Sequence, residues 1–569
     1  MLPSLICAVA AVIGVQTPSN ISNDQALYIH GGTMITNRPE QPEVEAILVY
    51  QGRIAALGSA QDVGALALAE NATRMDLKGG VLYPGFADGH AHLIGIGLAL
   101  NRVDLVGTRS MREVLDRCDE FLNLRDRDAG AKSLPKLAND WLHGRGWDQN
   151  DWQIKEFPTH HTLSAAFPVQ PVLLQRIDGH AALANLAAMR AAGISAQTPD
   201  PIGGKIVHDA DGNPTGVFID EAIDLVSEYA PMTSDAELER SLRMAAQALH
   251  EQGITSIHDA GASRRQIALF QKLAAAGQLG LRVHVMVSAS KKEELEYWLK
   301  RGPLIDSDVQ VRAIKVYADG ALGSRGAAML EDYSDDAGNQ GLLITSADEI
   351  QELARRGLQR GFQVCTHAIG DRANRLTLHA YRQAAGDDAA QLAAARFRVE
   401  HAQVVAVEDL ALFGKWGILP AMQPQHQTSD MPWVEARVGR QRARGAYAWK
   451  SMIDGGGIVI GGSDAPVGRL DPVGSFLAAV TRADADGNPA GGWFPDQAMS
   501  RQHALNTLTS WPAYGAFWEE SLGALRVGMH ADFTVLDKNL MSAELADLRT
   551  TEVLYTIFKG KVVFAKAGK

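Results

Sequence analysis

The run Val311-Arg312-Ala313-Ile314-Lys315-Val316 is one of eight short, apolar and mostly β-branched runs that decide the fold. The other seven lie at 81–86, 254–257, 281–287, 363–366, 397–400, 418–422 and 458–461. Stretches rich in Ala and Leu, which are typical of helices, stand between several of these runs, at 235–250, 264–276, 346–360 and 371–386. Alternating strands and helices predict a parallel sheet, and eight such units predict a closed (β/α)8 barrel.

An open, doubly wound sheet is the alternative arrangement of the same units. The dinucleotide-binding form of that fold begins with a G-x-G-x-x-G turn, and we find no such fingerprint in the first unit of this chain. Residues 104–235 do not follow the alternation of strands and helices. We therefore expect a TIM barrel over residues 85–522, with an insertion at about 104–235.

Strand-like segments also lie on both sides of the expected barrel. They occupy residues 26–36, 47–57 and 73–78 before it, and residues 531–536 and 553–564 after it. By pattern alone, these segments form either one small composite β-sandwich, built from residues 26–84 and 523–569, or two unrelated β segments.

The composition excludes some classes of protein. The 569 residues include 54 basic and 66 acidic side chains, so the net charge is 54 − 66 = −12. That balance argues against a nucleic-acid partner, which needs a basic face. The three cysteines, Cys7, Cys118 and Cys365, are too few for a disulfide framework, and they show no C-x-x-C spacing for a thiolate zinc site.

The first 25 residues resemble a targeting segment. Residues 5–15 are apolar and are followed by polar, turn-forming residues at 16–20, as in a signal peptide, although the first basic residue is Arg38. We expect residues 1–25 to be a signal peptide and the protein to be periplasmic or secreted. A disordered tail and a cytoplasmic location are the alternative. The sequence contains no run of 18 or more apolar residues, so it predicts no membrane-spanning helix.

The motif Gly-Phe-Ala-Asp-Gly-His-Ala-His at residues 85–92 is the sharpest chemical signal. On an extended strand, residues i and i+2 point to the same side, so His90 and His92 project together. Two neutral imidazoles at this spacing can chelate one divalent ion. Two barrel histidines that are held only by hydrogen bonds are an equally good interpretation of this motif alone.

Three further residues follow strand-like runs in the same way: His367, His401 and Asp464. In a barrel, functional groups lie at the carboxyl ends of the strands, so these five side chains would converge at one mouth. Five such placements are hard to attribute to chance. Lys315 lies within a strand-like run, where a lysine is costly to bury without a partner. The Asp-Gly turn that follows at 319–320 favours an inward position over an exposed edge.

With these motifs, the sequence resembles the metal-dependent amidohydrolase superfamily, in the branch called amidohydrolase family 3, which includes proteins like N-substituted formamide deformylase. The resemblance covers residues 26–566. Its motifs are GFADGHAH at 85–92, GRGWDQ at 144–149, IKVYADGALGSRGA at 314–327, HAIGDRA at 367–373, VEHAQ at 399–403 and GSDAP at 462–466. It implies that residues 525–533 return into one composite β-sandwich.

The resemblance also implies the roles of the site residues. His90 and His92 would bind the more buried metal, and His367 and His401 a second one. Lys315 matches a lysine that, in relatives, can be carbamylated by carbon dioxide and can then bridge two metals. Asp464 would be both a metal ligand and the catalytic proton shuttle. Imidazole and carboxylate ligands without a thiolate suit Zn²⁺ best, as one or two ions.

The residues of a binding site for substrate have weaker support. The resemblance suggests that Trp147, Asp148, Arg176 and His180, in the insertion, cover the mouth of the barrel; packing within the insertion is an equal alternative. Arg325 either holds a substrate carboxylate or pairs with an acidic neighbour. We expect Glu400, beside His401, to be structural and to point to the opposite side of its strand, and we expect the remaining histidines to lie at the surface or in the insertion.

The predicted function is hydrolysis of a carbon–nitrogen bond other than a peptide bond, in an amide, N-acyl or N-formyl group, by metal-activated hydroxide. The same site could serve a cyclic amidase, a deaminase or an esterase, or persist in a binding protein that has lost catalysis. We expect a small-molecule substrate and no nucleic-acid partner, and a homodimer is compatible with the sequence.

Overall fold

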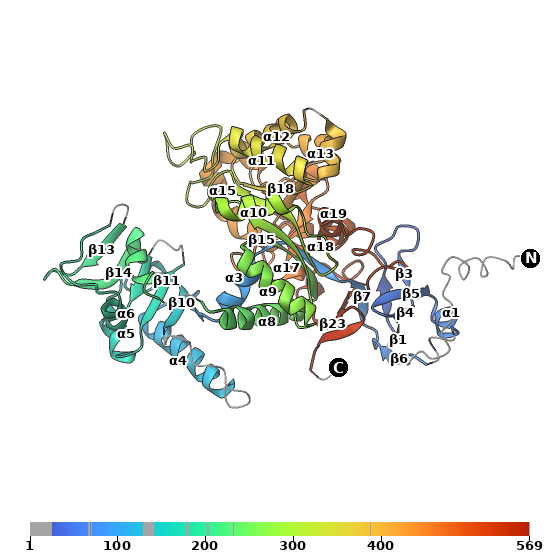
Figure 1. Ribbon diagram of the computed structural model, residues 1–569, viewed down its shortest axis with the longest axis horizontal. Coiled ribbons are helices and arrows are strands. Elements are labelled where there is room, and N and C mark those ends of the chain that lie inside the picture. Colours follow the sequence, from blue (N-terminus) through green and yellow to red (C-terminus); the bar gives the residue numbers. More distant parts are fainter. Residues whose placement is uncertain are drawn as a thin grey trace, which may run out of the picture.

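A computed structural model shows an eight-stranded barrel with two additional units (Figure 1). It describes residues 26–567 except 67–68, 70, 129–140, 178–180, 202–203, 231–232 and 387. The expected signal peptide at residues 1–25 lies outside the described residues. Within the described part of the chain, no helix is both long and apolar enough to cross a membrane.

The barrel strands pair in chain order and in parallel. They are β8 (Phe86–Ala91), β15 (Ile254–Ala262), β16 (Arg282–Ser288), β17 (Val309–Tyr317), β18 (Gln363–Ala368), β19 (Arg398–His401), β20 (Leu419–Met422) and β21 (Ile460–Gly461). The first and last strands meet where the amide of Asp464 donates to the carbonyl of His90 at 2.7 Å. The predicted (β/α)8 fold is confirmed.

Helices cover the outside of the barrel and complete its units. They are α3 (Leu93–Leu100), α8 (Asp235–Glu251), α9 (Arg264–Ala275), α10 (Lys292–Arg301), α11 (Ala347–Arg360), α12 (Asp371–Ala384), α13 (Ala389–Ala395), α14 (Leu412–Trp416), α15 (Pro424–Arg442), α16 (Trp449–Asp454), α17 (Pro472–Thr481), α18 (Arg501–Leu508) and α19 (Ser510–Gly515). Capping boxes that begin with Ser234, Ser263 and Ser346 start α8, α9 and α11. Each satisfies amide groups that the first helical turn leaves free.

One strand expectation is wrong in its placement. The run at 81–86, expected as the first barrel strand, is divided at Gly85. Its first part is β7 (Val81–Pro84), which pairs with the β-sandwich strands β2 (Thr33–Ile35) and β22 (Phe533–Leu536). The barrel strand β8 begins only at Phe86. An apolar run alone does not show which of two sheets its residues join.

The β-sandwich is composed of both ends of the described chain, as the resemblance implies. One sheet has the order β5-β4-β1-β6, and the other has the order β24-β23-β22-β7-β2-β3. The remaining elements are β1 (Ala26–His30), β3 (Glu43–Val44), β4 (Ala46–Tyr50), β5 (Arg53–Gly58), α1 (Ala60–Gly64), β6 (Thr73–Asp76), α20 (Leu545–Leu548), β23 (Val553–Phe558) and β24 (Lys561–Ala565). Ile29, Leu82, Phe533 and Ile557 share one buried cluster between the sheets. Two unrelated β segments are thereby excluded.

A third unit lies between β8 and β15 and extends away from the barrel (Figure 1). Its sheet has the order β13-β14-β12-β11-β10-β9, and its apolar clusters are separate from that of the barrel. Its elements are β9 (Val103–Asp104), α4 (Met111–Asp128), β10 (Leu142–Trp147), α5 (His160–Ala166), β11 (Val172–Arg176), β12 (Ala181–Ala184), α6 (Leu186–Ala191), β13 (Gly204–His208), β14 (Pro214–Asp220) and α7 (Asp224–Ser227).

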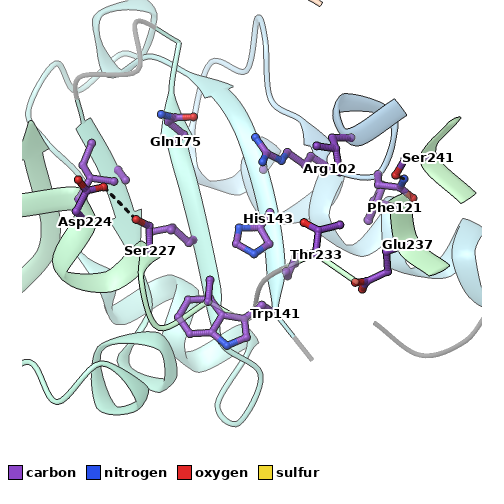
Figure 2. A pocket seen from close by; sticks show the side chains of 18 of the residues that line it. Arg102, Phe121, Trp141, His143, Gln175, Asp224, Ser227, Thr233, Glu237 and Ser241 are labelled. Carbon is purple, nitrogen blue, oxygen red and sulfur yellow. Dashed lines mark hydrogen bonds between the residues drawn. The ribbon is translucent and has the colours of Figure 1, made fainter. Parts of the chain in front are cut away.

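A cavity of about 430 Å³ lies where this unit meets α3 and α8 of the barrel (Figure 2). Trp141 and His143, at the start of β10, line one side of it, with their rings stacked at 6.0 Å. Glu237 and Ser241 of α8 line another side. The third unit therefore contacts the barrel around a hollow and has a core of its own.

Candidate metal centre

Three buried side chains converge at the carboxyl ends of the barrel strands. The imidazoles of His90 and His401 and the carboxylate of Asp464 place ligand atoms within 4.8 Å of one another. His90 Nε2 lies 3.4 Å from Asp464 Oδ1. The rings of His90 and His401 are 4.9 Å apart. Imidazole and carboxylate atoms so close together match the donor set of a site for Zn²⁺ or a similar ion.

The other three predicted ligands border the same cluster. His92 Nε2 lies 3.2 Å from Asp464 Oδ1, and Lys315 Nζ lies 3.5 Å from His90 Nε2. The ring of His367 lies 4.6 Å from that of His401. The structure therefore brings all six residues of the predicted metal set to one cavity.

Local backbone conformations aim two of these side chains. His401 and Asp464 have φ values of +71° and +58°, outside the strand region. Beside them, Gly462 allows β21 to approach β8, because a Cβ atom there would lie only 2.5 Å from the backbone nitrogen of His90. Non-glycine residues rarely adopt such φ values, and those that do cluster at functional sites.

The expected orientation of Glu400 is wrong. Its buried carboxylate contacts His90 Nδ1 closely and accepts two hydrogen bonds from Arg398, at 2.7 and 2.9 Å. The alternation of side chains along a strand fails here because β19 ends in the positive φ of His401. Glu400 and His401 therefore both reach the centre. A carboxylate on the second nitrogen of a metal-binding histidine fixes its tautomer.

Two further histidines fill the barrel beneath the centre. His258 Nδ1 accepts a hydrogen bond from Arg398 at 2.8 Å, and His284 lies between Gln310 and Gln363 at 2.9 and 3.1 Å. Both histidines are about 99–100% buried. The expectation that they lie at the surface or in the insertion is wrong. The sequences of these strands show no alternation of polar and apolar residues that would distinguish side chains inside the barrel from side chains at its surface.

Burial and hydrogen bonding set the protonation of the centre. Burial lowers the pKa of His367 to about 3, so this ring is neutral at physiological pH, the form that binds metals. Burial also lowers the pKa of the Lys315 ammonium. Burial opposes the ionisation of Asp464, but hydrogen bonds from His90 and His92 outweigh it and hold its pKa well below the usual range.

A cavity of about 440 Å³ opens above these residues. Apolar and aromatic side chains line much of it, including Tyr317, Leu322, Ile369 and Trp433. Helix α15 contributes polar side chains to another part, His426 and Asp430 among them. Its size and mixed lining suit a small organic molecule.

Three of the predicted substrate residues lie in the third unit, away from this cavity. Trp147 is buried in the third unit and donates to the carbonyl of Leu174 at 2.7 Å. Asp148 and Arg176 form an ion pair of 2.8 Å there. None of these three residues lines the cavity above the cluster. His180 lies outside the described residues.

Arg325 follows the barrel strand β17, but it too does not line the cavity. Both ends of its guanidinium hold the Asp335 carboxylate at 3.0 Å. Asp319, six residues before Arg325, accepts hydrogen bonds from three backbone amides instead. The guanidinium of Arg325 is therefore already paired with a carboxylate of this chain.

Comparison with known proteins agrees with this architecture. Residues 74–564 match the amidohydrolase family. The chain is 34% identical to amidohydrolase YtcJ of Bacillus subtilis (strain 168), over 95% of this chain and 99% of that protein. It is 27% identical to N-substituted formamide deformylase of Arthrobacter pascens, over 92% and 95% of the two chains.

A solved structure is also similar. A metal-dependent hydrolase from Pyrococcus furiosus superposes with a TM-score of 0.74 and 25% identity, over 91% of this chain and 100% of that one. Together with the family match, this likeness supports a hydrolase of amide-type bonds and a requirement for metal. The resemblance stated from the sequence motifs is confirmed: the chain belongs to the amidohydrolase family.

Proposed function

We propose that the protein hydrolyses a non-peptide carbon–nitrogen bond of a small organic amide, in an N-acyl or N-formyl group. The observation that carries this proposal is the convergence of His90, His401 and Asp464 at the floor of a cavity of substrate size. The name of the Arthrobacter relative, N-substituted formamide deformylase, supports an N-formyl or N-acyl substrate.

The donor set fits one or two divalent ions, Zn²⁺ first among them. His90, His92, His367, His401 and Asp464 would hold them, and Lys315 would contribute as a carbamate. Such an ion supplies Lewis-acid polarisation of the substrate carbonyl and makes a water molecule acidic enough to attack near neutral pH. The buried Lys315 amine can react with carbon dioxide: a bond forms from Nζ to carbon, one proton leaves, and the anionic carbamate suits neighbouring cations.

Asp464 has the position to move the protons of the reaction. Its carboxylate is ionised and lies between His90 and His92 at the cavity floor. As a general base it accepts a proton from the attacking water, and as a general acid it returns that proton to the leaving nitrogen. Glu400 holds His90 Nδ1 from below, so Nε2, which faces Asp464, would be the atom that binds an ion.

A substrate panel tests the proposal. Purified protein would be loaded with Zn²⁺ and assayed on N-formyl and N-acetyl alkylamines, N-acyl amino acids, cyclic amides, an aminated ring and simple esters. We expect hydrolysis of the linear amides, loss of activity with a chelator, and recovery with Zn²⁺. Turnover confined to cyclic amides, rings or esters would favour those activities, and no turnover in the metal-loaded protein would indicate a binding protein.

A further inference from the structure

Helix α15 presents one face to the cavity above the metal cluster. His426, Ser429, Asp430 and Trp433 all line this cavity, at positions i, i+3, i+4 and i+7 of the helix. This spacing places four side chains on one stripe of a helix. The metal cluster lies on strand ends, so this helical face forms a separate wall.

Asp430 on that wall is held firmly. The Tyr447 hydroxyl donates to Asp430 Oδ2 at 2.6 Å, and the Gln403 amide donates to the same oxygen at 3.0 Å. Tyr447 and Gln403 are both buried, at 2% and 5% exposure. The exposed Ser429 hydroxyl lies 2.8 Å from the other oxygen, Oδ1, and 3.0 Å from the His426 carbonyl, and it can donate to either. The carboxylate is therefore fixed in orientation by neutral donors.

Among the described residues, no lysine or arginine forms an ion pair with Asp430. A protonated His426, one turn earlier on α15, would act on its carboxylate through space, without an ion-pair contact. Burial raises the pKa of this carboxyl group, as expected for a charge withdrawn from water. Asp430 is half-buried, and carboxylates withdrawn from water are normally paired with a cation or bind a metal. The metal cluster does not include Asp430.

Trp433 complements this carboxylate on the same stripe. Its half-buried ring lines the cavity one turn beyond Asp430 and packs beside Gly323. The Arg437 guanidinium lies over this ring, 5.8 Å from its centroid, so one cation of the chain itself is already attracted to it. A carboxylate beside an aromatic ring is a recurrent recognition site for an ammonium group, because the ring face attracts cations. The cavity thus has a reacting end, with the metal cluster, and a wall that attracts positive charge.

We propose that Asp430 and Trp433 form a binding subsite for a protonated amine of the substrate. The substrate class is an amide that carries an ammonium group some methylenes away from its scissile bond, such as a singly acylated diamine. This inference rests on the proposed amide hydrolysis and adds the second recognition point.

Matched substrate pairs test the subsite. Mono-N-acetyl diamines with two to five methylenes would be compared with N-alkylacetamides in which a methyl replaces the ammonium group. We expect the wild-type kcat/KM to favour the ammonium member at least tenfold at one chain length. The Asp430→Asn variant should lower this preference 10- to 100-fold. Asp454→Asn, which changes an exposed carboxylate paired with Lys450, should keep it.

A second variant separates recognition from a structural role. Asp430→Glu keeps the charge on a side chain one methylene longer, so the preferred diamine should become shorter. If Asp430 serves only to join Tyr447 to Gln403, both variants would lower the melting temperature and affect the two substrate classes equally. Equal kcat/KM for both members of every pair in the wild type would overturn the proposal.

A binding measurement distinguishes failure of the subsite from failure of the proposed hydrolysis. Methanesulfonyl analogues of the same pairs resist hydrolysis and can be titrated calorimetrically into the wild-type protein loaded with Zn²⁺. Tighter binding of the ammonium analogue without turnover of any amide would sustain the subsite and reject the hydrolase. Turnover of amides together with equal binding of both analogues would support the hydrolase and reject the subsite.

Discussion

At the scale of single residues, Asp464 should matter more for turnover than for binding. The Asp464→Asn side chain keeps the shape and one ligand oxygen but cannot accept a proton. We expect kcat to fall by about 10²–10⁴, the usual contribution of a positioned acid–base group, with KM changing far less. Steady-state kinetics must be paired with metal analysis, since loss of an ion would also lower kcat. A variant with its metals and a near-normal kcat would rule out Asp464 as the proton carrier.

Glu400 should control metal affinity without contacting the metal. Arg398 and His90 together outweigh the effect of burial and hold the pKa of Glu400 well below its usual range, so it is an anion in the folded protein. Glu400→Gln removes the charge that orients His90, and we expect metal affinity to fall by about 10- to 100-fold. Competition with a chromophoric chelator measures this. Glu408→Gln, in an exposed pair with Arg375, serves as the control and should bind metal normally.

Five of the six expected ligands stand out in the sequence because each ends or follows an apolar run, whereas Lys315 lies within such a run and is assigned by the cost of burying its charge and by the family motif. Glu400 does not stand out, because strand alternation assigns it to the opposite side from His401, and only the positive φ of His401 cancels that rule. Asp430 carries no such signal at all. It lies within a helix, and its partners Gln403 and Tyr447 lie outside that helix, 27 and 17 residues away in the sequence.

At the scale of elements, the barrel interior should make the fold sensitive to acid. Burial lowers the pKa of His284 to about 3, whereas an unfolded histidine titrates near 6.5. The unfolded state therefore binds more protons between these values, and stability falls as pH falls. From pH 7 to 5 the loss is about 2 kcal/mol for this one side chain.

The His284→Asn variant isolates that contribution. It loses hydrogen bonds at neutral pH and so should be less stable than the wild type at pH 7. At pH 5 the difference in unfolding free energy should shrink by about 2 kcal/mol, because the variant has no imidazole to protonate. Denaturant unfolding of both proteins at the two pH values measures the difference. If the difference in unfolding free energy between the two proteins is the same at both pH values, His284 has the same pKa in the folded and the unfolded state.

The order of strands and helices was predictable because each barrel strand is a compact apolar run between turn signals. The division of the run at 81–86 into two strands was not, since Val81–Pro84 and Phe86–Ala91 are separated by one glycine and are equally buried. The expected bounds of the sandwich, 26–84, and of the barrel, 85–522, nevertheless fall at that glycine. The third unit was predictable only as a break in the alternation. Its distance from the cavity depends on tertiary packing, which local patterns do not record.

At the scale of the whole molecule, one buried ion pair connects the barrel to the β-sandwich. Arg282 of β16 is fully buried and donates to the Asp532 carboxylate at 2.7 Å, just before β22. Arg282→Met would leave Asp532 charged and unpaired, which costs about 3–5 kcal/mol. Thermal melting by circular dichroism should show the loss. Arg265→Met, in an exposed pair with Asp235, should change stability by less than about 1 kcal/mol.

The composite sandwich also determines when its strands can pair during biosynthesis. Strand β7 pairs with β22, and the paired residues Val81 and Leu536 are 536 − 81 = 455 positions apart. At ribosomal rates of about 5–20 residues per second, β7 waits about 20–90 seconds for its neighbour to be made. During that interval its apolar edge is open to other chains. A chaperone, or another transient cover on these first strands, would protect the nascent protein until the last strands emerge.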